Sequence, residues 1–145
     1  MNRVLCVLRI IWAAPWSLFG LGIGGLGLIS GGRIRRKGRV LEIWGGCLPK
    51  VLKVFPFFSG SPVATYGHVV LGRSDCYLDA CREHQMIHVR QYERWGVLFV
   101  PAYLFCSLAL WFLGKRPYYD NPFEREAFVE SCRPTEGAYC VAEGA

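Results

Sequence analysis

The sequence contains two long stretches without a charged side chain, and they restrict most strongly what this chain can fold into. The first runs from Ile10 to Gly32 and has arginines at both ends. It exceeds the ~20 helical residues that cross the hydrocarbon core of a bilayer, so it is long enough to span a membrane. The second covers residues 95–114 and contains Pro101 near its start. We expect the second stretch either to span or to form a buried or interfacial helix.

A cleaved signal peptide is the alternative reading of the first stretch, with Arg3 and Arg9 as its basic region. The stretch is long for a signal peptide and lacks an end of the A-x-A kind. The chain is also 52% hydrophobic, which is high for a soluble domain. We therefore predict a retained membrane anchor over residues 1–32.

The charge of the chain favours lipid as its partner. The formal net charge is +6, and five basic residues gather directly after the first apolar stretch. They are Arg33, Arg35, Arg36, Lys37 and Arg39. A nucleic-acid surface would interleave basic and aromatic residues, whereas a bunch beside an apolar stretch suits anionic lipid head groups. We predict a lipid bilayer and no nucleic acid as partner, and the positive-inside rule places the region after residue 33 in the cytoplasm.

The cysteines agree with a cytoplasmic location. There are seven, at irregular spacing and without a C-x-x-C pair. An odd, irregular set is typical of reduced thiols rather than of a disulfide framework.

Glycines within the first stretch imitate a nucleotide motif. Gly22, Gly24 and Gly27 have the G-x-G-x-x-G spacing of dinucleotide-binding loops, but that motif needs a strand before it and a helix after it. We therefore expect no bound nucleotide. The four-residue spacing of the pairs Gly20/Gly24 and Gly27/Gly31 allows close helix contact, but we ascribe it to the frequency of glycine in membrane helices.

The remaining patterns predict an α+β domain over residues 33–130, with a flexible tail at 131–145. Strands are expected at residues 39–44 and 63–71, from their β-branched and aromatic content. A helix is expected from Ser74 or Asp75 to Trp95, ended by Gly96, and a short helix in the PFEREAF segment after Asn121. Residues 51–58 are apolar and broken by Pro56, and their pattern leaves helix and strand open.

His84 and His88 are the residues most suited to carry chemistry. They lie four apart on the predicted helix, so their ring nitrogens can converge on one metal ion. Tyr77, Cys81, Tyr92 and Trp95 share the same helix face at spacings of three and four.

The surrounding sequence resembles a known family. The segments EHQMIHVRQYERWG, VLFVPAYL and DNPFEREAF resemble a family of uncharacterised small bacterial membrane proteins with a zincin-like H-E-x-x-H helix. The resemblance covers about residues 66–128. Its layout is similar to that of membrane zinc endopeptidases of the gluzincin type, which implies a small sheet, a metal-site helix and a second hydrophobic helix at 97–113.

This resemblance implies a zinc site and its ligands. His84 and His88 match the first two ligands, and Glu124 matches the third because Glu124 and Ala127 form E-x-x-A, with Glu126 as the alternative. The strand Gly67–Leu71 would border the cleft. Three protein ligands with one open position are typical of a catalytic zinc site, whose substrate here would be a peptide or protein.

One position departs from the family pattern. Gln85 stands where the catalytic glutamate should follow the first histidine. A carboxylate takes a proton from water and passes it on, whereas an amide can only hydrogen-bond. We therefore expect a membrane-associated metal-binding protein that is a weak or lapsed metallopeptidase.

Two alternatives stay open. In the first, the protein is not an enzyme and a structural zinc is closed by a fourth ligand, with Cys81 or His68 as candidates. In the second, no metal binds, and the two histidines pack among Tyr77, Tyr92 and Trp95. The metal hypotheses also impose a condition on residues 97–113. If this stretch crossed the bilayer, the PFEREAF segment would emerge on the side opposite His84, so it must be buried, interfacial or re-entrant.

Overall fold

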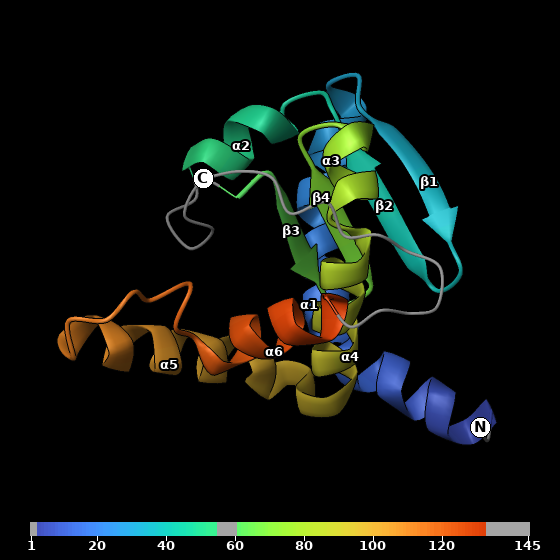
Figure 1. Cartoon of the computed structure of the whole chain (residues 1–145). Coiled ribbons are helices and arrows are strands. Elements are labelled where there is room, and N and C mark those ends of the chain that lie inside the picture. Colours follow the sequence, from blue (N-terminus) through green and yellow to red (C-terminus); the bar gives the residue numbers. More distant parts are fainter. Residues whose placement is uncertain (1–2, 55–60, 133–145) are drawn as a thin grey trace.

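The chain folds around a four-stranded mixed sheet, and the computed structural model describes residues 3–54 and 61–132 (Figure 1). The strands are β1 Arg33–Lys37, β2 Val40–Trp44, β3 Val63–Tyr66 and β4 Val69–Gly72. Their order in the sheet is β1-β2-β4-β3, with β2 and β4 parallel and the other two pairs antiparallel. β1 and β3 are therefore the edge strands, and the predicted α+β class is confirmed.

The predicted strands are right in one case and wrong in the other. β2 matches the strand predicted at 39–44 to within a residue. The single strand predicted at 63–71 is wrong, because β3 and β4 form a hairpin that turns at Gly67 and His68. Gly67 has a φ of +59°, a left-handed conformation that glycine adopts without steric cost. The basic run at 33–37 forms an edge strand that was not predicted.

Helices and one 3₁₀ turn account for most of the remaining described chain. They are α1 Arg3–Ile29, α2 Leu48–Val54, α3 Asp75–Ala80, α4 Arg82–Trp95, η2 Gly96–Leu98, α5 Phe99–Phe112 and α6 Pro122–Ser131. The single helix predicted from residue 74 or 75 to 95 is wrong in one respect, because it divides at Cys81 into α3 and α4. Residues 51–54 belong to α2, whereas 55–58 and the tail from 133 lie outside the described residues.

Local sequence explains where these helices begin and end. The Ser74 hydroxyl accepts from the Tyr77 amide at the start of α3, and the Asn121 side chain accepts from the Phe123 amide at the start of α6. These are N-caps, which satisfy amides that have no partner within the helix. Gly96 ends α4 at a φ of +55°.

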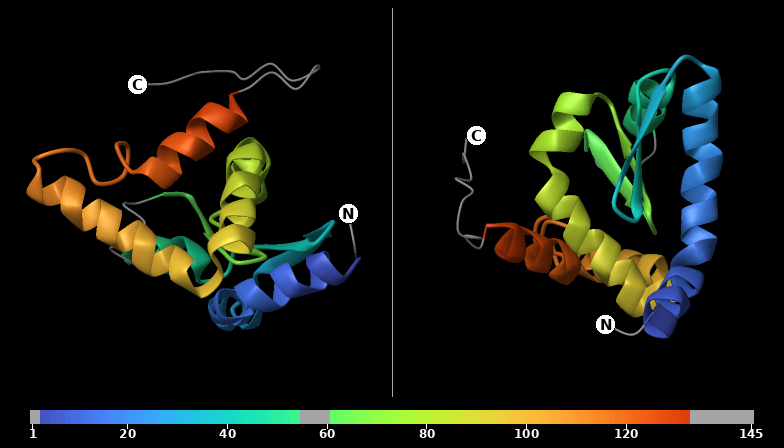
Figure 2. Two further views of the ribbon diagram at one scale, coloured as in Figure 1. Left: turned by 90° about the horizontal axis from the view of Figure 1, so that it is seen from below. Right: turned by 90° about the vertical axis from the view of Figure 1, so that its right-hand side faces the viewer.

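The sheet is covered on both faces (Figure 2). On one face, the second half of α1 packs on a buried cluster that includes Ile43, Val69 and Leu71. On the other face, Leu78 of α3 and Val89 of α4 pack on β2, β3 and β4. The α4 helix is thereby fixed against the sheet, and its histidine-bearing side points toward α6.

Two helical stretches are long and apolar enough to cross a membrane. One is α1, with 27 residues, and the other is the 31-residue helical stretch Arg82–Phe112, which ends in α5. The segment predicted as an anchor thus forms one continuous helix, but its second half lies against the sheet of the domain that follows it.

Candidate metal centre

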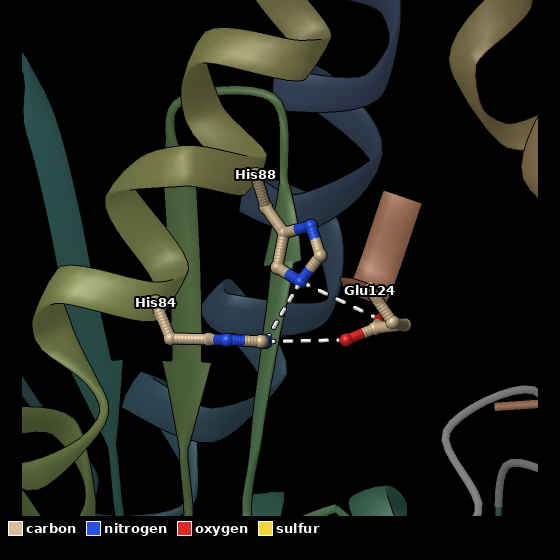
Figure 3. Close-up of side chains that lie close together, drawn as sticks. All are labelled: His84, His88 and Glu124. Carbon is tan, nitrogen blue, oxygen red and sulfur yellow. Dashed lines mark hydrogen bonds and ion pairs between the residues drawn. The ribbon is translucent and has the colours of Figure 1, made fainter. Parts of the chain in front are cut away.

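Three side chains that could hold a metal ion converge between α4 and α6 (Figure 3). The Nε2 atoms of His84 and His88 lie 3.1 Å apart. Glu124 faces both, with Oε2 at 3.2 Å from His84 Nε2 and Oε1 at 3.5 Å from His88 Nε2. All three ligand atoms lie within 4.8 Å of one another. The structure therefore brings together the three residues that the sequence analysis selected.

The backbone explains this convergence. His84 and His88 are one turn apart on α4, so both rings leave the same side of the helix. The Asn121 cap and Pro122 start α6 shortly before Glu124. The side-chain Nδ2 of Asn121 also donates to the Tyr103 carbonyl at 3.1 Å. The position of Glu124 is therefore set by α5 as well as by α4.

The cluster is mostly withdrawn from solvent. His88 is 7% exposed and Glu124 is 4% exposed. Burial by itself raises the pKa of Glu124, but hydrogen bonds with His84 and His88 outweigh it and lower the pKa to about 2. Glu124 is therefore a carboxylate at neutral pH and presents negative charge to the two imidazoles.

A network of polar groups around the cluster orients His88. The side-chain amide of Gln91 donates to the Phe123 carbonyl at 2.9 Å and to Glu126 Oε2 at 2.8 Å. Both donors of Gln91 are thus used, so its Oε1, 2.9 Å from His88 Nδ1, accepts a hydrogen bond from that nitrogen. With Nδ1 protonated, the lone pair of a neutral His88 lies on Nε2, which faces the cluster.

Tyr103 and Gln91 are site residues that sequence reasoning missed. The Tyr103 hydroxyl donates to Glu124 Oε1 at 2.8 Å. No sequence pattern linked Tyr103 to the site, because it lies on a different helix. Gln91 lies three residues after His88 on α4, and this spacing is the signal that could have linked it to the site. Glu126, the alternative third ligand, lies outside the cluster and instead binds Gln91 and Arg94.

Neither candidate for a fourth ligand joins the cluster. Within residues 3–54 and 61–132, the group of possible ligands consists of His84, His88 and Glu124 alone. His68 instead contacts Glu93, with Nε2 and Oε1 3.1 Å apart. Cys81 is not a member of the group, although it lies on the same stretch of chain.

A mainly apolar cavity of about 270 Å³ adjoins the cluster. Gln85, His88 and Glu124 line it together with Phe99 of α5 and all four residues of β3. The prediction that Gly67–Leu71 borders the cleft is wrong, because β4 is an inner strand and β3 is the edge strand beside the cavity. Gln85 is 6% exposed, and its Oε1 accepts a hydrogen bond from the Thr65 hydroxyl of β3.

The ring contacts of the histidines differ from those expected without a metal. Tyr77 and Trp95 are 48% and 41% exposed and do not enclose the pair. His84 instead packs against Phe128, with ring centroids 4.6 Å apart, and Tyr92 is buried with its hydroxyl on the Thr65 carbonyl.

The six cysteines that the structure describes are free.

Comparison with known proteins adds no relative. No protein-family model, no curated protein and no solved structure matches this chain. The functional interpretation therefore depends on the geometry of the site itself.

Proposed function

We propose that this chain is a membrane-associated zinc-binding protein of the zincin type, with weak or lapsed peptidase activity, whose main domain lies on the cytoplasmic side. The observation that carries the proposal is the convergence of His84, His88 and Glu124 beside a cavity. Two imidazoles and one carboxylate form a donor set that zinc accepts, and three protein ligands with an open position are typical of catalytic zinc sites.

The state of the three side chains is suited to binding zinc. In a neutral His88 the Gln91 acceptor favours the tautomer with the lone pair on Nε2, the pKa of Glu124 is lowered, and Tyr103 donates to one oxygen of that carboxylate. Polar partners of this kind orient metal ligands in known sites. Zinc held there would supply Lewis acidity and would acidify a water molecule at neutral pH.

The cavity suits a peptide. β3 is an edge strand, so its outer backbone groups are able to pair with an extended chain. Thr65 and Tyr66 of this strand line the cavity together with Gln85. A peptide laid along β3 would thus pass close to the three candidate ligands.

The chain departs from a competent peptidase at Gln85. Its amide faces the cavity, but an amide cannot take a proton from water and return it to a leaving amine. We therefore assign to this chain at most weak hydrolysis.

A structural metal is the second candidate, and one feature favours it. The cluster links α4 to α6, and the same two helices are joined by Gln91 to Phe123 and by Arg94 to Glu126. A metal in this position would fasten α6 to the domain even without turnover.

Elemental analysis of the purified protein tests metal binding. The wild type should contain one zinc ion per chain, and His88→Ala should contain almost none. The matched control is His68→Ala, which removes a buried histidine outside the cluster and should keep its zinc. A second matched pair separates the two glutamates, since Glu124→Gln should lose zinc and Glu126→Gln should keep most of it. Equal zinc in the wild type and His88→Ala, or none in the wild type, would refute the proposal.

A further inference from the structure

Two apolar helical segments meet at one end of the molecule. α1 contains Pro15, and its first half turns away from the half that covers the sheet (Figures 1 and 2). A proline removes a backbone hydrogen bond and bends a helix at that point. The first half of α1 and α5 both lie across the lower end of the view in Figure 1. They meet at η2, where Trp12 lies directly over Gly96 and where, just after Pro15, the Trp16 Nε1 donates to the Val97 carbonyl at 3.2 Å. We call residues 3–14 and 96–112 the platform.

The outer side of the platform is apolar and exposed. Along η2 and α5 the exposed residues recur at spacings of three and four, which defines one helix face. The residues of this face are Leu98, Pro101, Phe105, Leu108 and Phe112, and Val97, Ala109 and Trp111 beside it are exposed as well. Phe105 and Phe112 are both 74% exposed. The first half of α1 adds Val4, Leu5, Val7, Leu8, Ile11 and Trp12, which are 46% to 69% exposed. An exposed apolar surface of this extent marks a binding site for a protein or a membrane.

The platform is not built to cross a bilayer. α5 has 14 residues, and a helix of this length is about 21 Å long, which is shorter than the ~30 Å hydrocarbon core. The chain after α5 also returns along it, with Ser107 Oγ donating to the Pro117 carbonyl at 3.1 Å. If α5 stood upright in lipid, the non-helical residues 113–121 would lie at the depth of the hydrocarbon, where exposed backbone groups have no partners.

Charge complementarity identifies the partner as an anionic bilayer. No acidic residue precedes Glu42 in the sequence, so every charged side chain before it is basic. The hairpin between β1 and β2 carries several of them, and Arg39 Nη1 contacts Cys6 Sγ at 3.0 Å beside the first half of α1. Lys115 and Arg116 follow the other end of the platform and are exposed. Basic residues around an apolar surface suit anionic head groups around acyl chains.

We infer that the platform lies in the plane of an anionic lipid surface, with its exposed apolar side in the acyl boundary, and that neither apolar stretch crosses the bilayer. The inference deepens the membrane association proposed above and is independent of the metal. Phe99, Val100 and Leu104 of α5 also line the cavity. This mode of binding therefore holds the candidate metal centre at the surface of the bilayer, within reach of substrates that lie there.

Vesicle flotation of the full chain tests this inference. The chain is mixed with vesicles of phosphatidylcholine alone or with added phosphatidylglycerol, and the bound fraction is measured. Phe105→Glu should bind mixed vesicles about ten- to a hundredfold more weakly, because it removes an aromatic side chain that lipid would bury and adds a charge to the acyl boundary. The double variant Arg36→Gln/Lys37→Gln should bind roughly 25-fold more weakly, and wild-type binding should weaken in high salt.

Ile29→Glu is the matched control. Ile29 is 88% exposed and is the last residue of α1. That end of α1 lies away from the platform (Figure 2). In-plane binding leaves it in water, so this variant should float like the wild type, whereas a spanning α1 would place it near or within lipid. Circular dichroism on all variants shows whether they are folded.

Each contrary outcome has a distinct meaning. Equal losses in Phe105→Glu and Ile29→Glu would show that α1 is in lipid over its whole length, and would overturn the in-plane mode while leaving membrane association intact. Undiminished binding by a folded Phe105→Glu would exclude the platform as the contact surface. A wild type that binds neither kind of vesicle but self-associates through this face would overturn both the inference and the proposed membrane association, without bearing on zinc.

Discussion

The Nδ1 atom of His88 lies 2.9 Å from Oε1 of Gln91, and this contact ties the candidate metal centre to the packing of α6. The same Gln91 side chain donates to the Phe123 carbonyl and to Glu126. One glutamine thus fixes the tautomer of a candidate ligand and also holds the helix that carries Glu124. Orientation of the site and docking of α6 depend on the same residue.

Replacing Gln91 should weaken zinc binding without removing a ligand. In Gln91→Leu, His88 loses the acceptor that holds its Nδ1 proton and its ring orientation, and partners of this kind are worth about 10- to 100-fold in metal affinity. Competition with a chromophoric zinc chelator measures the change. Arg90→Gln, at the exposed neighbouring position, is the control and should bind like the wild type. Unchanged affinity in Gln91→Leu would mean that the ring is held by packing alone.

The sequence could predict only part of this site. The four-residue spacing of His84 and His88 shows that they share a helix face, so their convergence follows from helix geometry. Glu124 has no such local link, because it depends on how α6 docks, and it was selected only through a family resemblance. Tyr103 illustrates the limit, because its contact with Glu124 arises when α5 and α6 lie together.

The fold shows the same division between local and long-range information. The strand at 40–44 was predictable from its residue types, whereas the turn at Gly67 was hidden in a run that reads as one strand. The basic run at 33–37 becomes strand β1 only because β2 pairs with it. Hydrophobic pattern also cannot distinguish a helix face that meets lipid from one that meets a sheet. The spacing of Gly20 and Gly24 therefore did not reveal that this side of α1 packs on the sheet.

These glycines lead to a prediction about stability. A Cβ atom at Gly20 would lie 2.7 Å from Tyr66 Cβ and 3.0 Å from Val69 Cβ, whereas one at Gly22 would meet nothing within 4 Å. Gly20→Ala should therefore destabilise the fold by about 1–3 kcal/mol through overpacking. Gly22→Ala should be neutral or stabilise it by about 0.5–1 kcal/mol, because alanine favours a helix. Denaturant unfolding in mild detergent measures both, and equal effects would contradict the docking of α1 on the sheet.

A buried carboxylate makes stability depend on pH. Glu42 is 1% exposed and forms ion pairs with Arg35 and Arg82. Burial raises the pKa of Glu42, but hydrogen bonds from Arg82 and Arg35 outweigh it and hold the pKa below its ordinary value of 4.5. A carboxyl group with a depressed pKa stabilises the fold above its ordinary pKa, and this contribution is lost as the pH falls through the depressed value.

Glu42→Gln tests this assignment. At neutral pH it should lower the free energy of unfolding by about 1–3 kcal/mol, because charged hydrogen bonds are lost around a buried group. The difference from the wild type should shrink as the pH drops below 4.5, because the Glu42 carboxyl of the unfolded wild-type chain then begins to be protonated. It should vanish once the pH has fallen below the depressed pKa of the folded state. Glu83→Gln, at an exposed position on α4, should match the wild type throughout. A difference that does not change with pH would show that the ion pairs contribute nothing through charge.

Gln85→Glu should restore hydrolysis if the chain is a lapsed peptidase. Glutamine and glutamate are close in volume, so the change should disturb packing little. The new carboxylate would face the cavity beside His88, and the Thr65 hydroxyl that now donates to Gln85 could donate to it instead. A nearby metal cation would favour its charged form, which is the form that accepts a proton. A positioned acid or base typically contributes about 10²–10⁴-fold to the rate, and we expect a gain of this order over the wild type.

Cleavage of casein or of a quenched-peptide library measures this gain. The wild type, Gln85→Glu and the double variant Gln85→Glu/His84→Ala are compared, each with its zinc content. Activity that appears in Gln85→Glu and disappears in the double variant would require both the carboxylate and the metal ligand, because the double variant keeps the new carboxylate. Strong, chelator-sensitive cleavage by the wild type would show that a residue other than position 85 transfers the proton. A zinc-loaded but inactive Gln85→Glu would favour the structural role, in which the metal fastens α6 to α4 and no cleft has been kept for a substrate.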